Sequence, residues 1–249
     1  LIGTNTATGG SGGQIEITVG SGSAGVGGHI DITAGKTGGT TGGQITITTG
    51  VSTQTDSGHF IVTTPDGGAG GMSGDIILST GDSTSGNAGG LILGTGDGVG
   101  GRGGKIDLIA GSGDDGAGAD LTMAAGATSA TEGETGGHVS LKTGYSAATA
   151  SGDLTLLTAD AGAAGVSGSL ILSTGDVTDA STSGNMLIGT GDTAATGKGG
   201  NIVVTVGSGA ATGGSLTLSS GKAGGGNSGA ILIGTNTATG GSGGQIEIT

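Results

Sequence analysis

The chain has 249 residues, among them 67 Gly but no Cys or Trp, and only one each of Pro, Tyr and Phe. Six Lys and Arg against 19 Asp and Glu give a net charge of −13, and 10% of the residues are charged. This composition excludes a core filled by aromatic side chains, disulfide or cysteine-based zinc chemistry, collagen and a basic patch for nucleic acid.

The chain begins with LIGTNTATGGSGGQIEIT, and the same eighteen residues recur at 232–249. The return of Leu1 as Leu232 indicates a window on a tandem array. We interpret residues 1–249 as one continuous segment whose 231-residue repeat continues beyond both ends. Arrays of this kind are typical of long fibres rather than of self-contained domains.

From Ile15 onward, aliphatic or aromatic residues occur in pairs at i and i+2, and successive pairs follow one another at a nearly constant interval. This alternation predicts short strands that bury one face. The fifteen pairs are Ile15/Ile17, Ile30/Ile32, Ile45/Ile47, Phe60/Val62, Ile76/Leu78, Leu91/Leu93, Ile106/Leu108, Leu121/Met123, Val139/Leu141, Leu154/Leu156, Leu170/Leu172, Met186/Ile188, Ile202/Val204, Leu216/Leu218 and Ile231/Ile233.

Glycine occupies two positions around these pairs. It lies two residues before the first member in fourteen of fifteen cases, with Ala119 as the exception. It also lies five residues after it in most cases, with Pro65, Ala159 and Asn236 as substitutes. We expect two corners per coil, at backbone angles that favour Gly. The residue three before each pair is always Gly, Ala or Ser, which predicts a second wall of minimal side chains.

Together these patterns predict an all-β fold, a single-chain parallel β-solenoid of about 15 coils of about 15–16 residues. Its cross-section would be thin and two-walled, its coils would stack at about 4.8 Å, and its ends would be uncapped. Residues 74–98 are echoed by residues 168–192, six coils later, which indicates growth by duplication.

The recurring motif G-x-φ-x-φ-x-T/A-G, in which φ is apolar, resembles Gly/Ser/Thr-rich parallel β-solenoids of tandem-repeat surface, adhesin and fibre proteins. The resemblance extends over all 249 residues. It implies a structural role outside the cell or at its surface, with further copies of the repeat as end-to-end partners.

Asp follows the second corner position in six coils. Stacked carboxylates repel one another unless they are solvated, protonated or bridged by a cation. We expect solvated turn residues, with Ca²⁺ ligation as the alternative. The six are Asp66, Asp82, Asp97, Asp160, Asp176 and Asp192.

Two other functions have weaker support from the sequence. Thr18, Thr33, Thr48 and Thr63 form an outward column like that of an ice-binding surface, but the neighbouring column is mixed, which favours Thr as a β-former. An enzyme is not expected. His29, His59 and His138 lie in non-adjacent coils, Glu132 and Glu134 share one bulge without a cleft, and the glycine strings lack the Gly-Lys-Ser/Thr ending of a phosphate loop.

Aliphatic residues also occur between the two members of a pair, where the side chain is expected to point outward. They form a first stripe, Ile61, Ile77 and Ile92, and a second stripe, Ile171, Leu187 and Val203, with Leu232 further on. Apolar residues at three consecutive outward positions predict a lateral association surface.

The expected function is therefore a repeat segment of a very long extracellular fibre, appendage or matrix filament. The alternative is the stalk of a cell-surface adhesin or an ice-binding solenoid. No nucleic acid, cofactor or membrane insertion is expected, since no run approaches the roughly 18 apolar residues of a membrane span.

Overall fold

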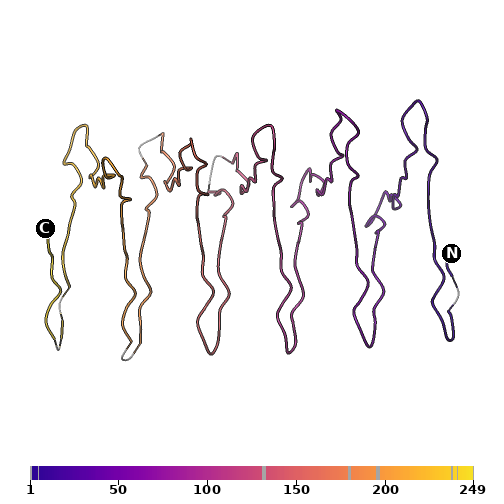
Figure 1. The fold of residues 1–249 in the computed structure, drawn as a ribbon, viewed down its shortest axis with the longest axis horizontal. Helices are drawn as coiled ribbons and strands as arrows, with labels where there is room; N and C mark the ends of the chain where they lie inside the picture. Colours follow the sequence, from indigo (N-terminus) through magenta and orange to yellow (C-terminus); the bar gives the residue numbers. More distant parts are fainter. Residues whose placement is uncertain are drawn as a thin grey trace. The chain divides into compact units, whose positions relative to one another are not determined.

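The structure is a computed structural model that describes residues 2–4, 6–130, 133–178, 181–194, 197–236, 238–239 and 241–248. The chain divides into two units, Leu1–Thr122 and Met123–Thr249, which are described separately. Within each unit the backbone forms a series of elongated loops, in which two extended segments run out and back between narrow turns (Figure 1).

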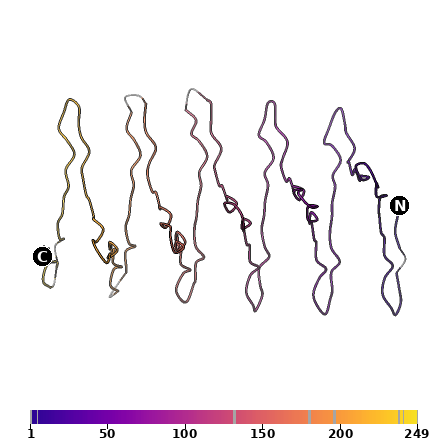
Figure 2. The ribbon, with the colours of Figure 1, turned by 45° about the horizontal axis from the view of Figure 1, so that its top comes forward.

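The described residues contain neither an α-helix nor a β-strand. The predicted parallel β-solenoid, or β-helix, is therefore wrong for this structure. The same loops seen from a second direction likewise show no sheet (Figure 2). No helix among these residues is long and apolar enough to cross a membrane.

The range of the backbone hydrogen bonds explains why no sheet forms. A ladder between stacked coils would join residues one coil apart, such as the neighbours of Ile15 and Ile30. The backbone hydrogen bonds between described residues instead reach no further than a single loop. The shortest in range join Gly71 N–H to Gly68 O and Gly165 N–H to Gly162 O, and the longest joins Gly137 N–H to Gly126 O. The backbone hydrogen bonds that the described residues make thus lie within loops rather than between them.

The extended segments keep the side-chain alternation of a strand. His29 Nε2 lies 3.5 Å from Asp31 Oδ2, and Lys105 Nζ lies 2.8 Å from Asp107 Oδ2. Contacts between residues i and i+2 require both side chains to project from the same side of the chain. Such a contact therefore spans the intervening Ile30 or Ile106.

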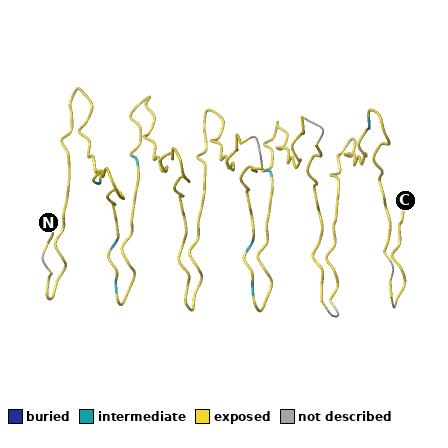
Figure 3. Cartoon of the chain, turned by 180° about the vertical axis from the view of Figure 1, so that it is seen from behind, coloured by how far each residue is buried: buried dark blue, intermediate teal, exposed yellow. Residues whose placement is uncertain are grey.

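The predicted apolar core is also absent. No described residue is buried, and both members of each of the fifteen aliphatic pairs are between 50% and 71% exposed (Figure 3). The chain presents 24090 Å² to solvent. A compact protein of its mass of 22.5 kDa would expose about 9,500 Å² and a fully extended chain about 33,000 Å². The wall of Ile and Leu side chains therefore has no second wall packed against it.

Glycine's left-handed backbone conformation does not explain the two framing positions. Among the described residues, positive φ occurs at Gly9, Gly70, Gly100 and Gly133, all inside the connecting loops. Neither the position two before a pair nor the position five after it is among them. The expectation that these corners need angles favouring Gly is therefore wrong for the described residues. An added Cβ would meet a close neighbour at several positions before a pair, such as Gly28 and Gly104, whereas at the positions after it, such as Gly20 and Gly96, it would meet open space.

Candidate functional site

The recurring structural site is a loop closure, which the described residues show before nine of the fifteen pairs. The N–H two residues before an aliphatic pair donates to the carbonyl oxygen of the Gly that follows the preceding pair. We call the donor the closing residue and the acceptor the corner residue. The nine closures, with N···O distances of 2.9–3.3 Å, are Gly28 to Gly20, Gly43 to Gly35, Gly58 to Gly50, Gly104 to Gly96, Ala119 to Gly111, Gly137 to Gly126, Gly152 to Gly144, Gly214 to Gly207 and Gly229 to Gly221.

The residue before each corner packs against the closing glycine. A Cβ built on Gly104 would lie 2.6 Å from Thr95 Cβ, and one on Gly28 would lie 3.2 Å from Val19 Cβ. Carbon atoms normally approach to about 3.5–4.0 Å. Close approach of the two segments therefore explains glycine at closures such as these, whereas at Gly58 and Gly152 an added Cβ would lie in ordinary contact, 3.6 and 3.7 Å from the opposing Thr Cβ.

The one alanine among the closing residues fits this account. Ala119 donates to Gly111 at 2.9 Å, as short as any closure among the described residues. The residue before its corner is Ala110, which has the smallest side chain other than Gly. A closing Cβ is thus compatible with the bond at this loop, where the opposing side chain is small.

These corners are the least exposed parts of the chain. Of the eight described residues of intermediate burial, five precede a corner, namely Ala34, Thr49, Thr64, Thr143 and Thr158. Two more, Ser52 and Ser146, lie in the loops beyond. What little packing the structure has is therefore concentrated at the closures, not at the aliphatic pairs.

Threonine hydroxyls join the same two segments in some loops. Thr80 Oγ1 and Thr95 Oγ1 donate to Gly89 O and Gly104 O, each at 3.0 Å, and Thr4 Oγ1 donates to Gly13 O at 3.3 Å. In the second unit Thr190 Oγ1 donates in the same way to Gly200 O at 3.3 Å. At these positions the threonine side chain bonds the carbonyl of the glycine two residues before a pair, and at Gly104 this bond accompanies a closure.

Two loops in which the corner position is not occupied by glycine contain a hydrogen-bonded tight turn instead. After Pro65, Gly71 N–H donates to Gly68 O at 2.8 Å, and after Ala159, Gly165 N–H donates to Gly162 O at 3.3 Å. Both bonds close tight turns, and they lie at equivalent places in the two halves of the duplicated sequence.

A second detail recurs between the same two halves. Ser52 Oγ lies 3.1 Å from Thr55 Oγ1 and accepts from its backbone N–H at 2.9 Å. Ser146 Oγ lies 2.9 Å from Thr149 Oγ1 and accepts from its N–H at 3.0 Å. The two halves of the duplicated sequence therefore share local hydrogen bonds as well as amino-acid sequence.

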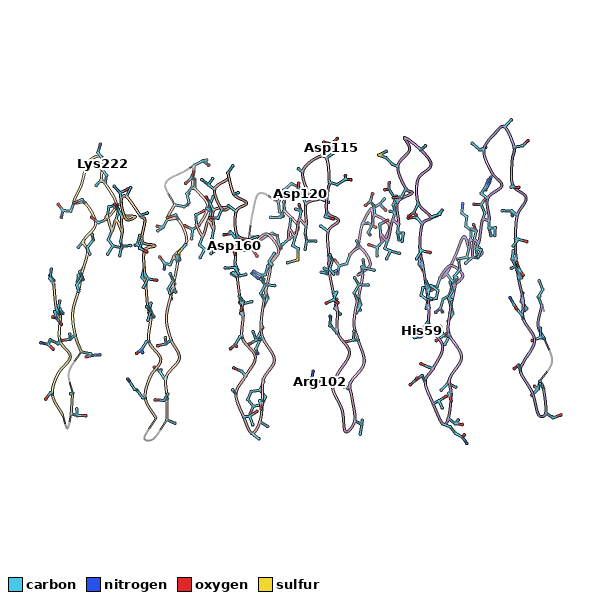
Figure 4. The ribbon with its side chains drawn as sticks, viewed as in Figure 1. His59, Arg102, Asp115, Asp120, Asp160 and Lys222 are labelled. Carbon is cyan, nitrogen blue, oxygen red and sulfur yellow. The ribbon has the colours of Figure 1, made fainter. Side chains whose placement is uncertain are left out.

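The six aspartates predicted to follow corners do not assemble a metal site. Within the described part of the chain, no three His, Asp or Glu side chains gather closely enough to hold an ion. Figure 4 labels His59, Arg102 and Asp115 of the first unit, which lie on different loops and do not converge. Calcium ligation by Asp66, Asp82, Asp97, Asp160, Asp176 and Asp192 stays a prediction without geometric support.

The histidines and the acidic bulge show no catalytic arrangement among the described residues. His29 contacts Asp31 alone, at 3.5 Å. Glu132 lies outside the described residues, so the bulge that it is expected to share with Glu134 is not part of the description. The described residues enclose no pocket.

The stripe residues are more exposed than the aliphatic pairs that flank them. Ile171 is 79% exposed, Leu187 85% and Val203 76%. Residues of the first stripe and Leu232 are exposed to a similar degree. All seven exceed every member of the fifteen pairs, so the structure leaves the predicted association surface accessible.

Sequence reasoning found the glycines but missed the residue opposite them. The signal was present, because Thr precedes the corner in many coils, as at Thr49, Thr80 and Thr143. These threonines were not connected with the closing position, since the contact joins residues nine apart in different extended segments.

No family model, no curated protein and no solved structure matches this chain. The repeat and its closures therefore carry the functional argument without support from relatives.

Proposed function

We propose that the chain is a repeat segment of a long structural protein, an extracellular or cell-surface fibre, appendage or matrix filament. The observation that carries the proposal is the return of the first eighteen residues from Leu232 onward, combined with local closures of one kind that occur in both units.

The closures support this function because each is local. A closing bond involves one loop and the side chain before its corner, so another copy adds further loops of the same kind. A self-contained domain would instead need contacts between residues far apart in sequence. Repetition of local units is the organisation by which repeat proteins grow in length.

The composition supports an exposed, hydrated material. The net charge of −13 keeps neighbouring segments soluble, while Gly, Ser and Thr supply a surface that water can solvate. No catalytic step is assigned to the chain, and its proposed partners are further copies of itself.

The proposal is tested by the growth of size with copy number. Proteins of one, two and four 231-residue repeats are prepared, and their radii of gyration are measured by small-angle scattering at high dilution. From one to four copies, the radius of gyration of a compact globule grows about 1.7-fold and that of an unfolded coil about 2.3-fold. The radius of gyration of a structural filament is expected to rise more steeply with copy number than that of the coil. Growth no steeper than that of the coil contradicts the proposal.

A second test uses the native material. An antibody raised against residues 1–18 meets its epitope once in every repeat, so immunogold labelling is expected to decorate filaments at regular intervals outside the cell. Labelling confined to the cell interior contradicts the proposed location.

A further inference from the structure

Two of the aspartates that follow a corner position are themselves followed directly by glycine. Asp97 comes after the corner residue Gly96, and Asp66 comes after Pro65, which takes the place of a corner glycine. Both aspartates are exposed, and so are the glycines that follow them. The two Asp-Gly steps are therefore open to water, and the contacts that define them lie within a single loop.

The local structure requires glycine at both steps. A Cβ built on Gly98 would overlap with the carbonyl oxygen of Arg102, and a Cβ built on Gly67 would overlap with that of Gly71. Each of these neighbours is a backbone atom, which cannot swing aside as the end of a flexible side chain can. The geometry of the loop thus keeps glycine directly after Asp66 and Asp97.

Glycine leaves the peptide nitrogen of the step accessible. It has no Cβ to crowd its own nitrogen, and its backbone reaches angles that other residues avoid. The N–H groups of Gly67 and Gly98 take part in none of the backbone hydrogen bonds between described residues. Each nitrogen can therefore approach the side-chain carboxyl carbon of the aspartate before it, and a reaction within one chain is strongly favoured over one between separate molecules.

We propose that Asp66 and Asp97 are modification sites, at which the chain converts aspartate to a β-linked isomer through a cyclic imide. The glycine nitrogen attacks Cγ of the neutral carboxyl group, the new N–Cγ bond closes a five-membered ring, and one carboxyl oxygen leaves with two hydrogens as water. Water then opens the ring. Cleavage of the N–Cγ bond restores aspartate, whereas cleavage between the nitrogen and the backbone carbonyl carbon leaves the chain joined through the side chain.

The four other aspartates at the same position are internal controls. They are followed by Ser, Ala, Val and Thr, whose Cβ crowds the nitrogen and whose backbone angles are more restricted. We expect the isomer to form more slowly at these four residues, which are Asp82, Asp160, Asp176 and Asp192.

The first experiment follows the isomer in the full chain of 249 residues. The protein is held for several weeks at physiological temperature and mildly acidic pH, which keeps a fraction of the carboxyl groups neutral. Peptides are then separated by liquid chromatography, and the β-linked form is identified by electron-transfer fragmentation. We expect it to accumulate at residues 66 and 97 at least about threefold faster than at any of the four controls. Equal rates overturn the proposal.

Two variants test the chemistry in opposite directions. Asp97→Glu lengthens the side chain by one methylene, so the isomer at residue 97 should disappear while Asp66 in the same molecule reacts unchanged. Val177→Gly places glycine after Asp176 and should raise the rate there at least about threefold. An isomer that persists in the first variant, or no gain in the second, overturns the proposal.

A third measurement concerns the loop that receives the modification. The β-linkage adds one carbon to the backbone between Gly96 and Gly104, inside the loop that their hydrogen bond closes. Lengthening a flexible loop slightly costs little, so amide protection of Gly104 in the isomerised chain should stay within about twofold of that in the unmodified chain. A larger loss overturns the inference that the loop accepts the change. These rates are measured on one copy, so they are independent of the proposed function and of growth with copy number.

Discussion

Replacing a closing glycine by alanine should change the protection of the closing amide against exchange in opposite directions at two closures that have the same hydrogen-bond length. Gly104 and Gly152 both donate at 3.1 Å. An added Cβ would lie 2.6 Å from Thr95 Cβ at the first position but 3.7 Å from Thr143 Cβ at the second. Neither glycine has a positive φ, so alanine is compatible with both backbones and only the available space differs.

The expected size follows from the net strength of an exposed hydrogen bond, about 0.5–1.5 kcal/mol. Such a bond slows exchange of the closing amide by about 2- to 13-fold. Gly104→Ala must move two carbons apart by about 1 Å to reach ordinary contact, which breaks the bond and removes this protection. Gly152→Ala keeps the bond and restricts the open chain, a gain of about 0.4–1 kcal/mol. Its protection should rise about 2- to 5-fold.

The assay is amide exchange followed residue by residue by NMR near room temperature. Thr95→Gly removes the opposing Cβ, so protection of residue 104 in the double variant should return to that of Thr95→Gly alone. Changes of the same sign at residues 104 and 152, or no recovery in the double variant, would refute the steric explanation.

Three further outcomes are expected. Thr95→Val removes a 3.0 Å bond to the carbonyl of Gly104 and should weaken the closure between Gly104 and Gly96 by about 1 kcal/mol, whereas Thr49→Val, beside a closure for which no such bond is found, should change amide protection by less than half as much. The exposed pair of Lys105 and Asp107 is worth at most about 1 kcal/mol, so Asp107→Asn should alter nearby exchange less than about fivefold at low salt and not at all in about 0.5 M salt; an effect that persists in salt contradicts this assignment. Because the described closures are separate, urea should change the circular dichroism gradually, and a single sharp transition would show coupling between coils.

The sequence predicted local geometry better than it predicted contacts between coils. Alternation at Ile30 correctly implies an extended backbone, and the pair of His29 and Asp31 shows the expected shared side. Alternation contains no information on which segment lies beside another, because the same pattern suits a bonded strand and a solvated one. The step from extended segment to stacked sheet was therefore the part that failed.

The glycines show a similar limit. Their positions were visible as a period, and they do mark the two ends of each closure, as at Gly20 and Gly28. The cause assigned to both was backbone angle, whereas the structure shows that a Cβ on Gly28 would contact Val19 and that one on Gly20 would contact nothing. A pattern of small residues does not distinguish these causes, since both remove the same Cβ. The predicted metal ligands and association surface concern partners, which a single chain does not display.

The closure between Gly126 and Gly137 shows how such a chain accommodates insertions. It encloses a longer loop than the closure between Gly35 and Gly43, yet both bonds measure 2.9 Å. Lengthening a flexible loop by this much costs only about 0.3 kcal/mol. Added residues thus remain inside the loop, and the alternation of the flanking segments keeps its phase. Foreign peptides grafted between these two glycines would be displayed in the same way, once in every repeat.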